Sequence, residues 1–363
     1  MNGCCACGSS DTSVVLDLGA VPPSDLFPDV ADPGPDQRSP LALMLCGACA
    51  LAQIVEDDTE PEVPRGIEPQ ALVDQAVTAL ESADAAGWLH GATMREFPSP
   101  HGGTWVPLMV ERGFTETEGS ADVVLDSFGV MHEPDQAAAW QARAAATAPG
   151  GVLLIQVHTF AAIVEAQQWT SLRHGHAAYY SLTALKNLLA AVGMSVVDAR
   201  TFPLYGDGLD GTLLVAALHG DLPASETVRG ILAHEAALGV DHAGSVAGLQ
   251  KLVDTDVARL RRWLESERDA GRSVHAYGAA SRTVALFALA GIDRTLVASV
   301  ADGSPAKQGR RMPTTDVPII APSDLVAADP DVVLVTLPDL LPELQHAYPE
   351  LAGRWVTEPP EAS

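Results

Sequence analysis

All five cysteines of the 363-residue chain lie within its first 49 residues. Cys4 and Cys7 form one Cys-x-x-Cys pair and Cys46 and Cys49 form a second, a spacing that lets each pair reach one tetrahedral ion. An odd, clustered set argues against a disulfide framework, and reduced free thiols are the alternative. We predict a closed four-thiolate Zn²⁺ site with a structural role, because its shell leaves no position for water or substrate. Cys5 is the spare cysteine and is not an expected ligand.

A second candidate for chemistry is the turn that follows a predicted strand at 92–97. In a doubly wound α/β fold, ligands bind at the carboxyl ends of the strands, over a glycine-rich turn. Two glycines of the turn would bring backbone close to a ligand, whereas two prolines remove N–H donors. A tight turn without a ligand is the alternative. The candidate cofactor-binding residues are Glu96, Ser99, His101, Gly102 and Gly103 of this turn, and Asp126 of the next predicted strand.

A third candidate is the turn between Gly278 and Arg282, at the start of a predicted helix. The N–H groups of a helix N-terminus can hold an anion, and Arg282 would add positive charge. A purely structural turn is the alternative interpretation.

Two successive α/β patterns must position these turns. After residue 69, predicted helices at 70–86, 104–112, 134–148 and 181–192 alternate with predicted strands at 92–97, 121–127, 152–157, 195–200 and 212–218. This alternation implies a mostly parallel sheet with helices on both faces. Apolar residues at helical spacing from Leu249 to Leu264 predict a long helix that ends near Gly271. Strands at 273–277, 296–301 and 331–337 and a helix at 281–290 then predict a second, Rossmann-like unit.

The expected architecture is therefore α/β in three parts. Residues 1–68 are rich in loops and proline, with short strands at 14–16 and 41–45, and form a small metal-binding lobe. Residues 69–220 form the first Rossmann domain, and residues 221–363 form the second.

The first Rossmann domain is expected to be shortened. Only residues 113–120 separate its second helix from the strand at 121–127, and a crossover needs a dozen or more residues. We therefore expect the strand that would supply an acidic residue for a ribose to be missing, with Glu116 or Glu118 as substitutes.

Composition excludes several partners. The formal net charge is −26, from 47 acidic and 21 basic residues, so nucleic acid and anionic membranes are poor partners. The first ten residues have neither a basic region nor an apolar core, and no apolar run reaches the ~20 residues that span a bilayer. We expect a cytoplasmic protein, monomeric or homodimeric, with a small-molecule substrate.

Several segments, taken in chain order, resemble one known family. They are the two cysteine pairs, 15–19, 121–125 with 131–135, 149–153, 174–176 with 179–182, 307–310 and 317–319. In this order they resemble the zinc-binding, S-adenosylmethionine-dependent deoxysugar C-methyltransferases of antibiotic pathways. The resemblance covers nearly the whole chain and implies a zinc-binding lobe, a class I methyltransferase-like domain and a C-terminal Rossmann-like domain that covers the active-site cleft.

The resemblance also implies a reaction, in which a proton is removed next to a ketone and the enolate carbon is methylated from S-adenosylmethionine. Histidine suits that step because its pKa lies near neutrality. By the resemblance, His176 is the base and His132 binds or polarises the substrate oxygen, with His174 and Arg173 beside them. Both histidines are then expected to line one cleft at the carboxyl edge of the middle sheet.

Some positions depart from the family. Its active segment reads Tyr-His-Glu-His, and here Arg173 and Gly175 replace the tyrosine and the glutamate. Residues 64–69 replace an aromatic-rich stretch that contacts ligand in the family. These departures argue against a nucleotide-sugar substrate. They keep two alternatives open: a homologue that catalyses another acid–base reaction, such as isomerisation, cyclisation or elimination, and a non-catalytic binding subunit.

Overall fold

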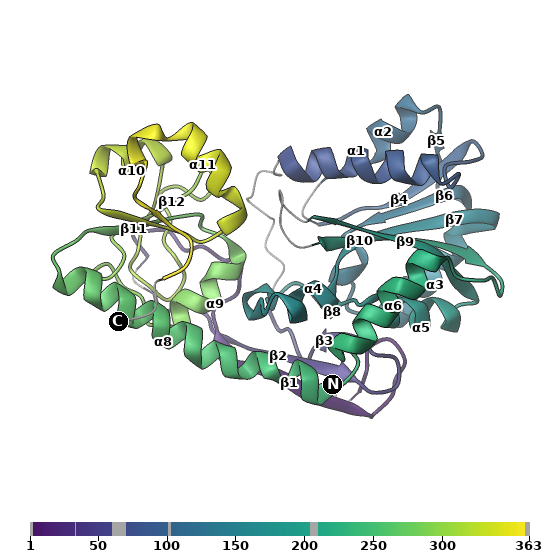
Figure 1. Ribbon diagram of the computed structural model, residues 1–363, viewed down its shortest axis with the longest axis horizontal. Helices are drawn as coiled ribbons and strands as arrows, with labels where there is room; N and C mark the ends of the chain where they lie inside the picture. The colour runs from purple at the N-terminus through teal and green to yellow at the C-terminus, as the bar shows by residue number, and fades with distance from the viewer. Residues whose placement is uncertain (1–2, 33, 60–69, 101–102, 204–209, 360–363) are drawn as a thin grey trace.

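Three β-sheets, two of them covered by their own helices, form the protein in a computed structural model (Figure 1). The structure describes residues 3–32, 34–59, 70–100, 103–203 and 210–359. In the view of Figure 1 the first sheet lies at the bottom of the molecule, below the other two sheets. Among the described residues, no helix is long and apolar enough to cross a membrane.

The first sheet belongs to the cysteine-containing lobe and has the order β1-β2-β3-β8, with every pair antiparallel. Its strands are β1 (Thr12–Val21), β2 (Ser39–Cys46), β3 (Ala52–Ile54) and β8 (Ala178–Tyr179). The two predicted strands of the lobe are confirmed, and both are longer than predicted. The last strand comes from far along the chain, so the lobe is joined by main-chain hydrogen bonds to the segment that carries His174 and His176.

The middle sheet has the order β5-β4-β6-β7-β10-β9, in which only β10 runs against its neighbours. Its strands are β4 (Thr93–Phe97), β5 (Thr115–Glu116), β6 (Ala121–Ser127), β7 (Thr147–His158), β9 (Met194–Pro203) and β10 (Asp210–His219). The helices of this part are α1 (Gln70–Ala85), α2 (Val106–Glu111), η1 (Val130–His132), α3 (Gln136–Ala146), α4 (Phe160–Glu165), η2 (Trp169–Ser171), α5 (Leu182–Ala191) and α6 (Glu226–Leu238). The mostly parallel sheet predicted from the alternation of helices and strands is confirmed.

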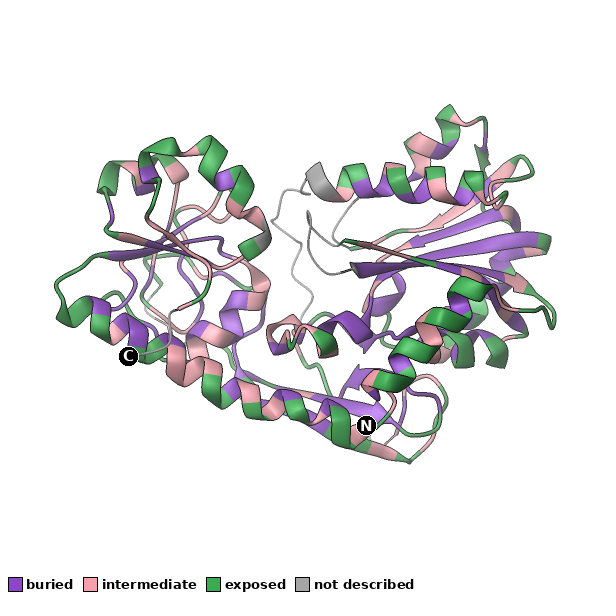
Figure 2. Cartoon of the chain, in the orientation of Figure 1, coloured by how far each residue is buried: buried purple, intermediate pink, exposed green. Residues whose placement is uncertain are grey.

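Alternating side chains explain why this sheet is covered on both faces. Val123 and Leu125 of β6 pack in one core cluster with α1 and α2, whereas Val124 packs in another with α3 and α5. Successive side chains of a strand point to opposite faces, so an unbroken apolar run needs a helical layer on each side. Figure 2 shows the result, with buried strands between helices whose outer faces are exposed.

The expectation that the ribose strand is missing is wrong in part. β5 pairs in parallel with β4 at the edge of the sheet, so the strand exists, reduced to Thr115 and Glu116. The short connection from α2 suffices because a two-residue strand needs few residues to reach the edge. Glu116 is exposed there, while Glu118 lies beyond the strand.

Two predicted elements are shorter than expected. The helix expected at 104–112 is α2 and begins only at Val106, because the N–H of Trp105 bonds to the Glu96 carboxylate. The strand expected at 296–301 is β12 (Val300–Ala301), because the N–H groups of Leu296 and Val297 both bond to Asp293 in a turn.

The third sheet is parallel throughout, with the order β13-β12-β11-β14-β15. Its other strands are β11 (Val274–Tyr277), β13 (Ile319–Ile320), β14 (Val332–Val335) and β15 (Trp355–Val356). The helices of this part are α7 (Ala243–Val246), α8 (Gly248–Asp269), α9 (Ser281–Leu289), α10 (Pro322–Ala328), η3 (Pro338–Leu340), α11 (Leu341–Ala347) and η4 (Pro349–Leu351). The expected second Rossmann-like unit is therefore present.

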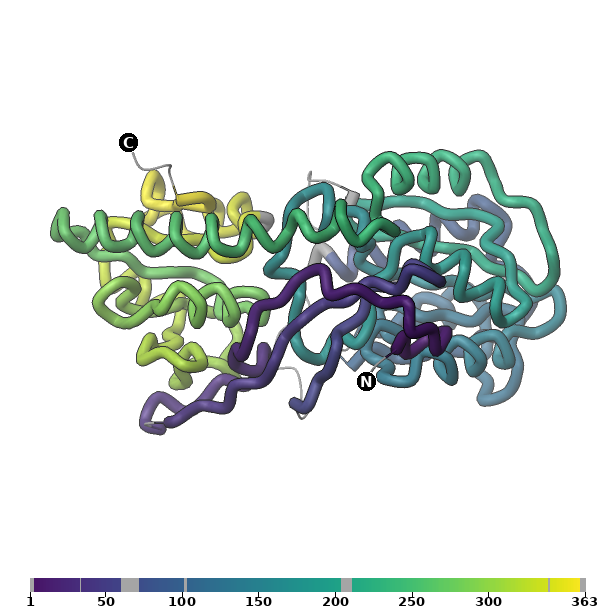
Figure 3. Tube along the Cα trace, turned by 90° about the horizontal axis from the view of Figure 1, so that it is seen from below, coloured from purple at the N-terminus to yellow at the C-terminus, as the bar shows by residue number. Residues whose placement is uncertain are grey.

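The predicted long helix, α8, connects two parts of the molecule. Its 22 residues span about 33 Å at 1.5 Å per residue. Leu249 and Val253 near its start pack in one cluster with the lobe, whereas Leu260 and Leu264 near its end pack against the third sheet. Figure 3 shows α8 running along both parts. The predicted end is confirmed, since Gly271 follows the last turn with a φ of +72°.

Candidate functional site

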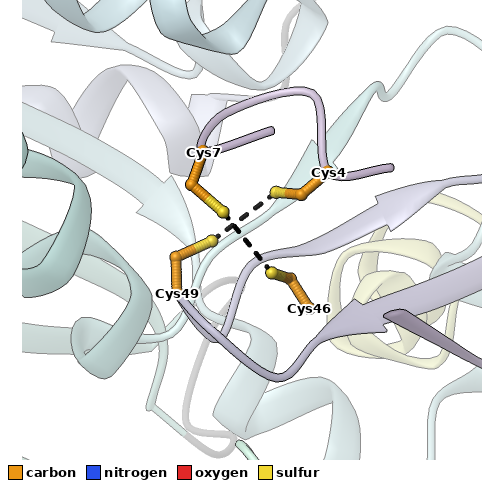
Figure 4. Close-up of side chains that lie close together, drawn as sticks. All are labelled: Cys4, Cys7, Cys46 and Cys49. Atoms are coloured by element: carbon orange, nitrogen blue, oxygen red, sulfur yellow. Dashed lines mark hydrogen bonds between the residues drawn. The ribbon is translucent and has the colours of Figure 1, made fainter. Parts of the chain in front are cut away.

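The four predicted zinc ligands meet at one point (Figure 4). The Sγ atoms of Cys4 and Cys49 lie 3.6 Å apart, as do those of Cys7 and Cys46, and all four lie within 4.8 Å of one another. A tetrahedron with Zn–S bonds of ~2.3 Å has edges of about 3.8 Å, so the four thiolates fit one zinc ion. Cys5 is not among them: its N–H donates to the Gln53 side chain, and its own side chain packs against the core.

Both cysteine pairs form the same turn. In each pair, the residue after the second cysteine donates its N–H to the carbonyl of the first, from Gly8 to Cys4 and from Ala50 to Cys46, both at 2.9 Å. Gly8 and Ala50 have φ angles of +71° and +63°, a conformation that is easy for glycine and unusual for alanine. This shared geometry is why the Cys-x-x-Cys spacing alone identified the ligands.

The lobe holds the histidine segment through several contacts. Beyond the β3–β8 pairing, Ile54 donates its N–H to Ala177 (3.1 Å) and Gly175 donates its N–H to the Asp57 carboxylate (2.7 Å). His174 is buried, and its Nε2 lies 3.1 Å from the Pro40 carbonyl. His174 therefore connects the segment to the lobe.

The structure brings His132 and His176 into direct contact. Their ring centroids lie 4.7 Å apart, with the rings at 87°. Nδ1 of His132, at the end of η1, lies 2.7 Å from the carbonyl oxygen of Gly175. Nε2 of His176 lies 3.0 Å from Nε and 2.5 Å from Nη2 of Arg173. All four residues predicted for catalysis thus lie in or beside one cluster.

Tyr179 supports the histidine segment from within. Its hydroxyl accepts the N–H of Arg173 at 3.0 Å and donates to the carbonyl of Ser171 at 3.2 Å, and its ring lies 5.8 Å from that of His176. Burial raises the pKa of the Tyr179 hydroxyl, so this side chain remains a neutral support.

Sequence reasoning missed His158, the last residue of β7. Burial, together with the positive charges of Arg282 and Arg173, lowers the pKa of His158 to about 3, so the ring is neutral at physiological pH. The two arginines come from the first turn of α9 and from the histidine segment, so the third part of the chain faces the same region. The available signal was the position of His158 at the carboxyl end of a central strand.

At the predicted cofactor turn, Glu96 has a structural partner. Its carboxylate accepts the hydroxyl of Thr104 at 2.5 Å and the N–H of Trp105 at 2.7 Å, and burial raises its pKa. Ser99 is partly buried, and Gly103 has a φ of +76°, as a sharp turn before α2 requires. His101 and Gly102 lie outside the described residues, as does the segment 64–69.

Asp126 is buried, and both of its oxygens are engaged. One accepts the N–H groups of Gly129 and Val130 at 2.8 and 3.0 Å, and the other lies 2.5 Å from Nε of the buried Arg143. This carboxylate orients η1, and therefore His132, rather than presenting an open oxygen for a ligand.

The loop between β6 and η1 contains a strained residue. Phe128 has a φ of +59°, which costs a bulky side chain about 1–3 kcal/mol. A Cβ on Gly129 would lie 3.0 Å from the carbonyl oxygens of both Phe97 and Pro98, so only glycine lets the loop approach the end of β4 this closely. Strain of this kind tends to persist at functional sites, and here it lies four residues before His132.

A cavity of about 150 Å³ lies between η2, α8, α9 and the end of β14. Arg259, Arg282 and Thr283 line it, as does Trp169. Within the described residues, Nε of Arg259 and the hydroxyl of Thr283 are buried without a hydrogen-bond partner. The third predicted turn thus adjoins this cavity.

The chain matches three family models in succession. Residues 4–62 match a zinc binding domain, residues 63–199 match a methyltransferase domain and residues 209–360 match a C-methyltransferase C-terminal domain. The chain is also 23% identical over 406 residues to the C-methyltransferase NovU of Streptomyces niveus, with 99% of this chain and 95% of that protein covered.

Two solved structures are similar to part of the chain. The glycopeptide N-methyltransferase MtfA complexed with S-adenosyl-L-methionine is 14% identical over 40% of this chain and 93% of its own, with a TM-score of 0.30. Magnesium protoporphyrin IX methyltransferase from Synechocystis is 11% identical over 42% and 84%, also with a TM-score of 0.30. These structural similarities are too weak to indicate function. The three family models, by contrast, follow one another along the chain, and the full-length relative covers the same residues. The chain belongs to the three-part C-methyltransferase family, which combines a zinc-binding domain, a methyltransferase domain and a C-methyltransferase C-terminal domain.

Proposed function

We propose that this protein transfers a methyl group from S-adenosylmethionine to the carbon next to a ketone in a small metabolite of natural-product biosynthesis, in the cytoplasm. The observation that carries the proposal is the His132–His176 pair, held in ring contact beside Arg173. Removal of a proton next to a ketone needs a base with a pKa near neutrality, which histidine provides. The guanidinium of Arg173 favours the negative charge that develops on the substrate oxygen.

The methyl donor would be held at the carboxyl ends of β4 and β6, which is where parallel sheets bind ligands. Ser99 and Gly103 of the turn would bring main-chain groups close to the donor, and the exposed Glu116 on β5 offers a carboxylate for ribose hydroxyls. Glu96 and Asp126 are proposed to hold the loops at this edge rather than to contact the donor, because their carboxylate oxygens already accept hydrogen bonds from within the protein. When bound, S-adenosylmethionine supplies an electrophilic methyl group.

The cavity beside α9 is proposed to receive the part of the substrate that does not react. Arg259 and Arg282 offer guanidinium donors there, beside the carboxylates of Asp256 and Glu358, and the Thr283 hydroxyl is a further hydrogen-bonding group. Its volume of about 150 Å³ suits a group of a few heavy atoms. The succession of family models supports methyl transfer over a homologue that has lost it.

Thermal shift with S-adenosylmethionine tests donor binding. A donor at a hundred times its dissociation constant should stabilise the protein by about 2.7 kcal/mol. The absence of any shift with either S-adenosylmethionine or S-adenosylhomocysteine would rule out the proposed donor.

Methyl transfer itself is tested with methyl-¹³C-labelled donor and a panel of ketones, both free keto acids and nucleotide-linked keto sugars. The ¹³C shift of the product distinguishes a methyl group on carbon from one on oxygen or nitrogen. The double variant His132→Gln/His176→Gln should lose transfer while retaining donor binding. Transfer at the wild-type rate in the double variant would contradict the proposed site.

A further inference from the structure

The short helix η1, which ends at His132, is held at its C-terminal end by a buried side chain. A 3₁₀ turn of three residues makes few internal hydrogen bonds, so its terminal carbonyl groups need other donors. Nε2 of Gln136 donates to the carbonyls of Val130 and Glu133, both at 2.8 Å. These two carbonyls lie on either side of His132 in the chain. Gln136 therefore fixes the main chain around His132.

The contacts of Gln136 determine which way its amide group faces. A carbonyl oxygen only accepts hydrogen bonds, so the group that faces Val130 and Glu133 must be the NH₂ group. The amide oxygen then faces the hydroxyl of Tyr180, which donates to it. Gln136 and Tyr180 are both fully buried, at 0% exposure. Burial also raises the pKa of Tyr180, so the hydroxyl keeps the proton that it donates.

Tyr180 belongs to the segment that carries His176. It directly follows β8, four residues after His176, and its carbonyl accepts the N–H of Phe160 at 2.7 Å. Its ring packs edge-on against Trp140 of α3, with the ring centroids 5.6 Å apart and the planes at 88°. The position of the Tyr180 hydroxyl is thus set by the main chain of the histidine segment and by packing on α3. Tyr180 and Gln136 together form a buried polar bridge from this segment to η1.

The Gln136 end of the bridge is fixed to the zinc-binding lobe. Gln136 is the first residue of α3, whose N-cap, Asp135, accepts the N–H of Ala138 at 2.9 Å. The N–H of Ala137 donates to the carbonyl of Cys5 at 3.3 Å, inside the first cysteine turn. The main chain from which the Gln136 side chain extends is therefore held on both sides.

From these contacts we infer that Tyr180 and Gln136 are positioning residues, which hold His132 against the ring of His176. The inference rests on the proposed function, because the bridge affects turnover only if the two histidines take part in the reaction. The ring of His132 also contacts the Gly175 carbonyl through Nδ1 at 2.7 Å, and the bridge keeps η1 at the distance that this contact requires.

The bridge makes a prediction for the unmodified protein. Both hydrogens of the Gln136 amide are bonded to buried carbonyls, so they should exchange slowly with deuterium in ¹⁵N-labelled, zinc-loaded, full-length protein. The amide signal is assigned through the carbons of its own side chain. The amide of the exposed Gln167 is the control and should exchange fast. Exchange of the Gln136 amide as fast as that of Gln167 would overturn the inference.

Tyr180→Phe removes one oxygen atom, the donor to the Gln136 amide oxygen. Because the rings of His132 and His176 lie edge-to-face at 4.7 Å, each shifts the proton resonances of the other. We expect the ring C–H signals of His132 to move in Tyr180→Phe. Tyr277→Phe removes the hydroxyl of another buried tyrosine, on β11 of the third sheet, and should leave them in place.

Two outcomes of this experiment would count against the bridge. His132 signals that stay in place in a folded Tyr180→Phe would overturn the inference, as would signals that move equally in the Tyr277→Phe control. If Tyr180→Phe does not fold, the exchange of the Gln136 amide in the wild type still decides.

Turnover gives a third readout once a methyl acceptor is found. A misplacement of about 1 Å costs up to ~10²-fold in rate, so we expect Tyr180→Phe to lose about tenfold in kcat, with an unchanged KM for S-adenosylmethionine. Tyr277→Phe should keep the wild-type rate. Equal kcat values for Tyr180→Phe and wild type would overturn the positioning role. If the wild type methylates no acceptor, the proposed function fails, while the amide exchange and the ring signals still decide whether the bridge holds His132.

Discussion

The zinc site and the histidine cluster show two different ways of building a site. Each half of the zinc site is a local turn, closed by a hydrogen bond between residues four positions apart. The antiparallel pairing of β1 with β2 brings the two turns together. The histidine cluster instead joins η1 to a segment some 40 residues later, and both halves need outside support. That support comes from Asp126 for η1 and from the lobe for the segment 173–176.

The comparison shows that the cysteine cluster and the histidine cluster are connected through main-chain strand pairing. The second cysteine pair runs from the last residue of β2 into the turn before β3, and β3 pairs with β8, which begins two residues after His176. A closed zinc shell has no chemistry of its own to offer a substrate. Its contribution is a rigid lobe against which the histidine segment is ordered.

The largest expected effect comes from breaking the zinc site. Structural zinc contributes an apparent ~10–16 kcal/mol in small domains, which is comparable with the total stability of ordinary proteins. Chelation of the metal or Cys46→Ser should therefore lower the melting temperature by more than ~10 °C and abolish any methyl transfer. The measurements are zinc content by elemental analysis and thermal denaturation. Cys5→Ser is the control and should keep one zinc per chain. A Cys46→Ser protein with full zinc and normal melting would break the comparison.

The second effect concerns the anchoring of the lobe to the third sheet. Arg311 and Asp36 form a buried ion pair at 2.6 Å, with side chains 7% and 9% exposed. Arg311→Met leaves the carboxylate without its partner and should cost about 3–5 kcal/mol in urea unfolding. Arg354→Met breaks a more exposed pair with Asp329 and should cost less than about 1 kcal/mol. Equal costs for the two variants would show that the lobe is not anchored through Arg311.

The same ion pair predicts a dependence on pH. Hydrogen bonding to Arg311 holds the pKa of Asp36 below its ordinary value. A carboxyl group whose pKa is lowered by folding stabilises the protein above its unfolded pKa of ~3.9, and that contribution is lost as pH falls through the folded pKa. The stability difference between wild type and Arg311→Met should therefore be constant near neutrality and shrink below about pH 4. A difference that grows on acidification would contradict this origin.

The smallest expected effect comes from the contact that joins the two regions. Asp57→Asn removes the charge from the acceptor of the Gly175 N–H, and at this exposed position we expect a loss of about 1 kcal/mol. Amide hydrogen exchange at Gly175 should speed up roughly fivefold, with the overall melting temperature nearly unchanged. Asp58→Asn changes the neighbouring exposed carboxylate and should leave that exchange rate as it is. Slower or unchanged exchange in Asp57→Asn would show that the lobe does not hold the segment at this point.

Local patterns predicted most of the elements and one complete site. The apolar run of β6 and β7 required a strand buried on both faces, and the cysteine spacing required a metal turn. Predictions were least accurate where a hydrogen bond at an element's end intervened. The Glu96 side chain delays the start of α2, and the main-chain carbonyl of Asp293 shortens β12. Neither contact is visible as a periodicity, because each joins a loop to a residue outside its own element.

The sequence by itself determined the zinc ligands, the two α/β patterns and the long helix α8, because each rests on spacings within a few turns of chain. Only the tertiary structure decided that Asp126 supports η1, that the lobe holds the histidine segment, and that Arg173 contacts Nε2 of His176. These depend on which side chains meet after the sheets have packed. A titratable side chain acquires its environment from such partners, so residue type could nominate the histidines but could not show which contacts each of them makes.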